Sequence, residues 1–151
     1  MTTLTQKDLL SILPHRPPML MLDGVDEVSD DRILAYKNVQ EDDPQLKGHF
    51  PGRPVMPGVL LVEAMGQAGA VLARQRGGWD PARQDILFMG IERARFRVPV
   101  RPGDRLVLEV VPLRTGRHWR LRGEARVEGR VVASAEFTAV IVDRQGGADA
   151  G

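Results

Sequence analysis

Two patterns of apolar and polar positions divide the sequence. Over residues 57–73 nearly every position is apolar or small, and the Leu, Ala and Met content favours a helix over a strand. After Gly77 and Gly78, apolar and polar residues alternate, which is typical of an antiparallel sheet with one solvated face. One long apolar helix followed by antiparallel strands predicts an α+β fold, with the helix packed on the sheet.

Turn residues divide the alternating half into several strands. Glu128 and Gly129 stand between two alternating runs and predict a tight hairpin turn. The predicted strands cover residues 86–88, 92–97, 105–113, 118–127 and 130–142.

Shorter elements are predicted before the apolar helix. Thr5 lies three residues before Asp8, a spacing that resembles a capping box and predicts a helix ending near Leu13, because Pro14 follows. The pair Pro17–Pro18 favours extended backbone over residues 19–22, and residues 32–39 predict a strand.

The length of 151 residues suits one domain, which we expect over residues 1–144. Residues 145–151 are small and polar and predict a flexible tail. The chain has no cysteine, which excludes disulfides, thiolate catalysis and Cys-ligated zinc. Its first residues lack the basic-then-apolar order of a signal peptide, so a cytoplasmic location is expected.

The charge is small in total but unevenly distributed. A net charge of +1 gives no global attraction to nucleic acid or to a membrane. Residues 1–73 carry −4 and residues 74–151 carry +5. The arginines of the second half either mark solvated strand faces or form a basic surface for an acidic partner, and both interpretations stay open.

A segment rich in proline and glycine precedes the apolar helix. Residues 44–58 hold four prolines and three glycines, which predicts a stiff loop of defined shape. His49 lies in this loop. Because histidine titrates near neutral pH, an imidazole held at a fixed place could serve as a base.

The predicted helix has one ionisable side chain, Glu63. Its other polar side chain, Gln67, follows one turn later on the same face. A buried carboxylate is costly unless it is paired or functional. Glu63 is therefore either paired with an arginine or is a general acid or base whose pKa is raised by burial. For His15 and His118 we expect surface or packing roles.

Several functional classes are excluded by missing motifs. The sequence has no Gly-x-Ser-x-Gly element and no glycine-rich nucleotide signature. Its three histidines lack the spacing of metal ligands, so no metal site is expected. An aromatic content of 5% offers little surface for stacking on nucleic-acid bases.

The run from Gly48 to Ala68, GHFPGRPVMPGVLLVEAMGQA, strongly resembles the signature of the FabZ-type (3R)-hydroxyacyl-acyl-carrier-protein dehydratases. Further segments that resemble the family are Leu13-Pro14-His15-Arg16 and residues 90–97, 99–104 and 119–123. The resemblance implies a hotdog fold, in which an antiparallel sheet wraps around one long central helix. It also implies homodimers with active sites at the interface, usually assembled as trimers of dimers, and no cofactor or metal.

The resemblance also implies roles for individual residues. The family's loop histidine, here His49, removes a proton from C2 of the acyl thioester. Its helix glutamate, here Glu63 from the other subunit, helps the C3 hydroxyl leave as water, which gives a trans-2-enoyl thioester. The N–H of Gly58 is the implied donor to the thioester oxygen. Phe50 and Val59 are assigned to substrate binding.

The implied partner is an acidic acyl carrier protein that presents its substrate on a phosphopantetheine arm. We expect part of its docking face at Arg93, Arg95, Arg97 and Arg101. Two other functions stay open: a hotdog acyl-thioesterase, and a non-enzymatic module that binds acyl-carrier protein or acyl-CoA. Isomerase activity of the sister FabA type is disfavoured, because that group has Asp where Glu63 stands.

Overall fold

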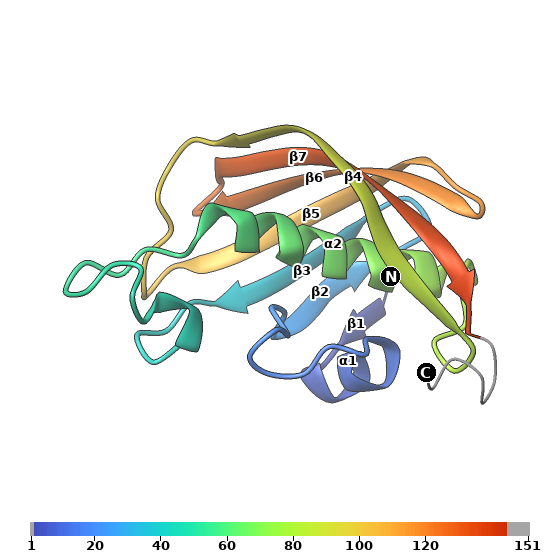
Figure 1. The fold of residues 1–151 in the computed structure, drawn as a ribbon, viewed down its shortest axis with the longest axis horizontal. Coiled ribbons are helices and arrows are strands. Elements are labelled where there is room, and N and C mark those ends of the chain that lie inside the picture. Colours follow the sequence, from blue (N-terminus) through green and yellow to red (C-terminus); the bar gives the residue numbers. More distant parts are fainter. Residues whose placement is uncertain (1, 145–151) are drawn as a thin grey trace.

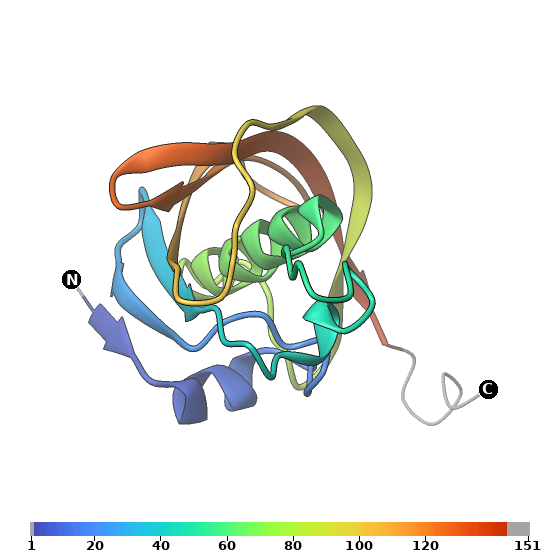
Figure 2. The same cartoon turned by 90° about the vertical axis from the view of Figure 1, so that its left-hand side faces the viewer.

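The long apolar helix forms where the sequence predicts it. In the computed structural model, which describes residues 2–144, α2 spans Gly58–Gln75 and lies along the concave face of a seven-stranded sheet (Figure 1). Viewed from the side, the sheet curls around this helix (Figure 2). The expected α+β arrangement, an antiparallel sheet wrapped around one long helix, is confirmed. The predicted tail, residues 145–151, lies outside the described residues.

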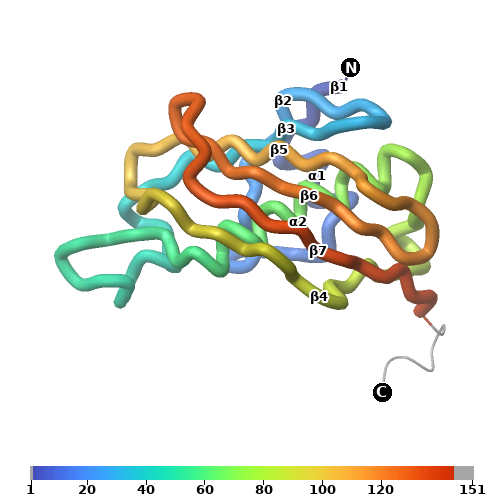
Figure 3. The backbone as a smooth tube through the Cα atoms, turned by 90° about the horizontal axis from the view of Figure 1, so that it is seen from above, coloured from blue at the N-terminus to red at the C-terminus, as the bar shows by residue number. Residues whose placement is uncertain are grey.

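Every strand pairs with its neighbours in antiparallel orientation, in the order β1-β2-β3-β5-β6-β7-β4 (Figure 3). Consecutive hairpins place β5, β6 and β7 side by side, whereas β4 lies beyond β7 at one edge of the sheet. The strands are β1 (Thr2–Leu4), β2 (Gly24–Val28), β3 (Ile33–Asn38), β4 (Gln84–Phe96), β5 (Arg105–Arg114), β6 (His118–Val127) and β7 (Arg130–Asp143).

The structure corrects the strand prediction at the edges of the sheet. The two strands predicted over residues 86–88 and 92–97 form one strand, β4, with register shifts after Phe88 and after Glu92. These irregularities absorb the residues that break the alternation. Strands β1 and β2 were not predicted. The β6–β7 turn is confirmed, because Glu128 and Gly129 both have positive φ, as a type I′ hairpin requires.

The first helix, α1 (Gln6–Ile12), has the predicted cap. The Thr5 hydroxyl accepts from the Asp8 N–H, and the Asp8 carboxylate accepts from the Thr5 N–H. Extended backbone was expected over residues 19–22, but Met19 belongs to a turn over residues 17–19. Residues 20–22 belong to no helix or strand, and Met21 and Leu22 are each 1% exposed and join the core. A single 3-10 turn, η1 (Pro44–Leu46), lies within the proline-rich segment.

The core lies between α2 and the inward face of the sheet. Alternate residues of β5, namely Leu106, Leu108 and Val110, are fully buried against it. Helix and sheet approach closely at Gly123 on β6, where a Cβ atom would lie 2.8 Å from the sulfur of Met65. No helix among residues 2–144 has the length and apolar character needed to cross a membrane.

Candidate active site

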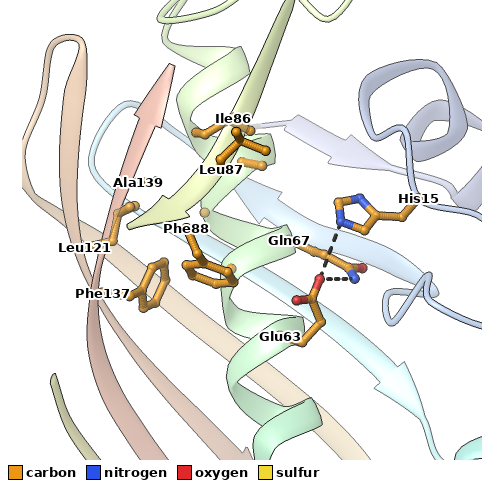
Figure 4. A pocket seen from close by; sticks show the side chains of 12 residues that line it. His15, Glu63, Gln67, Ile86, Leu87, Phe88, Leu121, Phe137 and Ala139 are labelled. Carbon is orange, nitrogen blue, oxygen red and sulfur yellow. Dashed lines mark hydrogen bonds and ion pairs between the residues drawn. The ribbon is translucent and has the colours of Figure 1, made fainter. Parts of the chain in front are cut away.

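A cavity of about 180 Å³ lies beside α2, toward β4, β6 and β7. Its polar lining consists of His15, Glu63 and Gln67, which lie close together in Figure 4. The rest of the lining is apolar or glycine: Gly66, Gly69, Ala70, Ile86, Leu87, Phe88, Leu121, Phe137 and Ala139. The cavity can therefore hold an apolar chain with a polar group beside the carboxylate.

Both polar contacts of Glu63 converge on one carboxylate oxygen. Oε2 accepts a hydrogen bond of 2.8 Å from Gln67 Nε2, and His15 Nε2 lies 3.4 Å from the same oxygen. Within residues 2–144, Oε1 accepts no hydrogen bond from the protein. The alternative of an arginine partner for Glu63 is wrong, because its partners among residues 2–144 are a histidine and an amide.

Gln67 has its amide orientation set by the backbone of residues 19–21. Its oxygen accepts from the N–H of Met21 at 2.8 Å, and its nitrogen donates to the carbonyl of Met19 at 2.8 Å. The side chain is 1% exposed, so this arrangement cannot be exchanged for water contacts at low cost. The amide thus presents a fixed N–H to Glu63.

The pKa of Glu63 is lowered, whereas the sequence predicts that burial raises it. Burial is the largest influence and raises the pKa, as expected. Hydrogen bonds from His15 and Gln67, together with the charge of His15, lower it further than burial raises it. The pKa of Glu63 therefore lies below its ordinary value of 4.5, and the carboxyl is ionised at neutral pH in this structure.

His49 is held by its own loop. Its Nδ1 lies 2.8 Å from the carbonyl oxygen of Val55, and a carbonyl can only accept. Nδ1 therefore carries the proton, and in the neutral ring the lone pair resides on Nε2. The ring also stacks on Phe50, with centroids 4.1 Å apart. This arrangement leaves a base at a fixed orientation.

The loop around His49 has internal hydrogen bonds that keep its shape. Val55 N–H donates back to the His49 carbonyl, and Phe50 and Arg53 exchange backbone hydrogen bonds across a tight turn. Gly52, within that turn, has φ of +73°, a conformation that favours glycine. The defined shape predicted from the prolines and glycines of this loop is confirmed, and its stiffness stays a prediction.

The structure does not join His49 to Glu63 within one chain. No hydrogen bond or ion pair links them among residues 2–144, and His49 does not line the cavity. The loop that carries His49 projects past the first turn of α2 (Figure 1). His15, for which a surface or packing role was expected, lies beside Glu63 instead. The only sequence signal for this was the run Leu13-Pro14-His15-Arg16.

The first turn of α2 has free backbone donors. The helix has no side-chain cap, and the N–H groups of Gly58 and Val59 form no hydrogen bond with the described residues. Glycine at position 58 leaves room for the ring of Phe96, since a Cβ there would lie 2.8 Å from that ring and would force it to move. Val59 and Phe50, the expected substrate contacts, are 72% and 45% exposed.

The four arginines of the expected docking face differ in their surroundings. All four are exposed. Arg93 is paired with Glu136 at 2.9 Å, whereas Arg95, Arg97 and Arg101 have no carboxylate partner among residues 2–144. Arg101 lines a surface hollow with Phe50 and Arg53, next to the His49 loop. No group of three metal-ligating side chains occurs in the same described range.

Comparison with known proteins identifies close relatives. A family profile described as a FabA-like domain matches residues 13–136. A protein of Myxococcus xanthus named 3-hydroxyacyl-[acyl-carrier-protein] dehydratase FabZ is 48% identical over 139 residues, which are 91% of each chain. A protein with the same name from Anaeromyxobacter dehalogenans strain 2CP-1 is 50% identical over 137 residues, 89% of this chain and 88% of that one.

A solved structure also matches over nearly the whole chain. It is described as the dehydratase heterocomplex ApeI:P from Xenorhabdus doucetiae, with a TM-score of 0.75 and 23% identity over 91% of each chain. At this identity the likeness concerns the fold alone, and it agrees with the hotdog arrangement of helix and sheet.

Proposed function

Because this chain belongs to the FabA-like domain family, we propose that it is a (3R)-hydroxyacyl-[acyl-carrier-protein] dehydratase of fatty-acid synthesis or a related acyl pathway. It removes water from the 3-hydroxyacyl thioester and produces the trans-2-enoyl thioester. The observation that carries this proposal is an ionisable Glu63 beside an apolar cavity, in a chain about half identical to proteins named as this dehydratase. Residues 1–144 act as one hotdog domain.

The elimination needs a base at C2 and an acid at C3. His49 Nε2, whose lone pair is free, takes the C2 proton. The electron pair of that C–H bond forms the C2–C3 double bond while the C3–O bond breaks. The leaving hydroxyl takes a proton from Glu63 and departs as water. The N–H of Gly58, at the positive end of α2, stabilises the charge that develops on the thioester oxygen.

Glu63 must be protonated to act as the acid. When an acyl chain fills the cavity it excludes water, which strengthens the burial effect that already raises the pKa of Glu63. The bound substrate thus favours the acid form, although the carboxyl is ionised in the free chain. No metal or cofactor is needed for these steps.

A second copy of the chain completes the site. Among residues 2–144, strand β4 has one edge without a partner strand, and it carries five of the ten large apolar side chains that are exposed. These are Leu87, Phe88, Met89, Ile91 and Phe96, with exposed fractions of 40–61%. An apolar, unpaired edge favours association. Three residues of β4 also line the cavity, so a partner at this edge can bring its His49 loop to Glu63.

The substrate arrives on an acidic carrier protein. Arg95, Arg97 and Arg101, which have no carboxylate partner among residues 2–144, can bind it, while Arg93 must first exchange its contact with Glu136. Reversing the charge of Arg95 and Arg101 should raise KM for carrier-bound substrate and leave KM for a short pantetheine thioester nearly unchanged. Equal changes for both substrates would contradict the docking face. Trimers of dimers and a cytoplasmic location remain predictions from the sequence.

The proposed activity is tested by following a 3-hydroxyacyl carrier-protein thioester with the purified protein. We expect the ultraviolet absorbance of the enoyl thioester to rise without release of free thiol. His49→Ala and Glu63→Gln should each lose orders of magnitude in kcat. His118→Leu, which changes an exposed histidine at the start of β6, should be unaffected.

Two other results would assign a different function. Release of free thiol with no enoyl product would identify a thioesterase, in which a carboxylate activates water. Tight binding of the acyl thioester without either product would identify a non-enzymatic acyl-binding module.

A further inference from the structure

The histidine that lies against Glu63 in this chain is His15, not His49, and the elimination described above gives His15 no task. His15 Nε2 lies 3.4 Å from Glu63 Oε2. Its imidazole is 28% exposed and lines the same cavity as the carboxylate. Figure 4 shows the ring directed at Glu63 from the chain segment that precedes β2.

The segment that carries His15 is fixed on both sides of the ring. The guanidinium of Arg16 donates hydrogen bonds to the backbone carbonyls of Leu10, Leu13 and His15. The carbonyl of Arg16 accepts from the N–H groups of Met19 and Leu20. Gln67 then ties residues 19 and 21 to α2. The imidazole is therefore presented to the helix by a hydrogen-bonded turn.

The two contacts of Glu63 determine which oxygen can carry a proton. Gln67 presents an N–H to Oε2, so Oε2 is an acceptor. His15 Nε2 approaches the same oxygen, and its N–H can donate there as well. A proton on the carboxyl must therefore reside on Oε1, which makes no hydrogen bond with residues 2–144.

We propose that His15 is a positioning residue for Glu63: with Gln67 it holds Oε2, so that Oε1 is turned to the substrate hydroxyl. One hydrogen bond leaves the carboxylate free to rotate about its Cγ–Cδ bond, whereas two donors on Oε2 from different directions restrict that rotation. This inference rests on the proposed dehydratase function. His15 itself does not exchange a proton with the substrate.

The unpaired nitrogen of His15 argues against a role in packing alone. Nδ1 is buried and has no hydrogen-bond partner among residues 2–144. A buried polar atom without a partner costs about 1–3 kcal/mol. Leucine would fill a similar volume without this cost, so a site selected only for stability would favour an apolar residue.

The test compares three variants of the full chain at position 15. His15→Leu removes the donor and keeps the volume. His15→Gln can place an amide N–H where Nε2 lies, whereas the shorter side chain of His15→Asn reaches only the position of Nδ1. His118→Leu is the matched control at an exposed histidine. Each protein is assayed with a 3-hydroxyacyl carrier-protein thioester, and its Tm is measured.

We expect His15→Leu to keep or raise Tm while kcat falls about 10–100-fold, the loss typical of a misplaced catalytic group, with KM nearly unchanged. His15→Gln should regain most of kcat, and His15→Asn should not. If His15→Leu does not fold, the difference between Gln and Asn decides the question.

The inference is overturned if His15→Leu retains wild-type kcat, or if His15→Gln and His15→Asn are equally impaired. These results differ from failure of the proposed function. In that case the wild-type protein itself would yield no enoyl thioester.

Discussion

Gly66 is the position at which one added methyl group tests the cavity most severely. It lies on the same face of α2 as Glu63 and Gln67 and lines the cavity with them. A Cβ atom at Gly66 would lie 2.0 Å from Cζ of Phe88, and 2.7 Å and 3.0 Å from two other ring atoms. The variant Gly66→Ala therefore cannot form without moving the Phe88 ring.

The size of the effect follows from these contacts. Carbon atoms pack at about 3.5 Å or more, so the tip of the ring must move by roughly 1.5 Å. The movement strains the Phe88 rotamer, at about 0.5–1.5 kcal/mol. It also disturbs the edge-to-face pair with Phe137, whose centroids lie 5.3 Å apart, at about 0.5–1.5 kcal/mol. Alanine has a higher helix propensity than glycine, by about 1 kcal/mol, which offsets part of this cost. The free energy of unfolding of Gly66→Ala should therefore fall by roughly 0–2 kcal/mol.

Gly69→Ala is the matched control on the same helix and the same cavity. Its Cβ would meet Leu121 at 3.3 Å, which a small shift of that side chain relieves. Because both variants gain the same helix propensity, urea denaturation should find Gly66→Ala less stable than Gly69→Ala by about 1–3 kcal/mol, the cost of moving the Phe88 ring.

The same change should alter the substrate preference of Gly66→Ala. The displaced ring and the added methyl group exclude one or two methylenes of the acyl chain from the cavity. Each excluded methylene weakens binding by about 0.8 kcal/mol. The ratio of kcat/KM for long-chain to short-chain substrates should fall by about tenfold. Equal stability of the two variants, together with unchanged chain-length preference, would refute this account of the cavity.

Three further substitutions test other parts of the structure. Gln67→Leu leaves the N–H of Met21 and the carbonyl of Met19 without partners, so chemical denaturation should show a loss of about 2–4 kcal/mol; a loss below 1 kcal/mol would argue against this role. The hydrogen bond from Arg126 is the main cause that holds the pKa of Glu109 below 4.5. This hydrogen bond stabilises the folded protein at pH values above 4.5, and the stabilisation is lost as the pH falls through the pKa that Glu109 has in the folded state. Glu109→Gln should therefore be less stable than wild type by about 1 kcal/mol at pH 7, and this difference should vanish in acid. Thr5→Ala removes the cap of α1 and should cost about 1 kcal/mol by thermal unfolding, whereas no change would show that α1 frays freely.

Elements with a regular pattern were predictable from the sequence. The uninterrupted apolar run predicts α2 to within two residues at its C-terminal end, and strict alternation predicts β6 with its bounds unchanged. Strand β4 was divided in two because Met89 and Gly90 interrupt its alternation, and bulges accommodate such interruptions only when β7 is beside them. The short strand β1 has too few residues to show any period.

The candidate site was predictable in its residue types but not in its contacts. Helical spacing predicts that Gln67 lies on the same face as Glu63, which is confirmed, and the structure adds a hydrogen bond between them. No local pattern could predict that His15 reaches Glu63, because that contact depends on how residues 10–20 fold across the helix. For the same reason the predicted direction of the pKa shift of Glu63 was wrong. Burial was visible in the sequence, but the donor from another segment was not.

The central claim is that His49 of one subunit and Glu63 of its partner form one active site. The direct test mixes inactive His49→Ala and Glu63→Gln proteins, dissociates them and lets them reassociate. Half of randomly formed dimers contain one copy of each, and one of their two sites regains both wild-type groups, so about a quarter of wild-type activity should return. If both residues acted within one chain, the mixture would stay as inactive as its components.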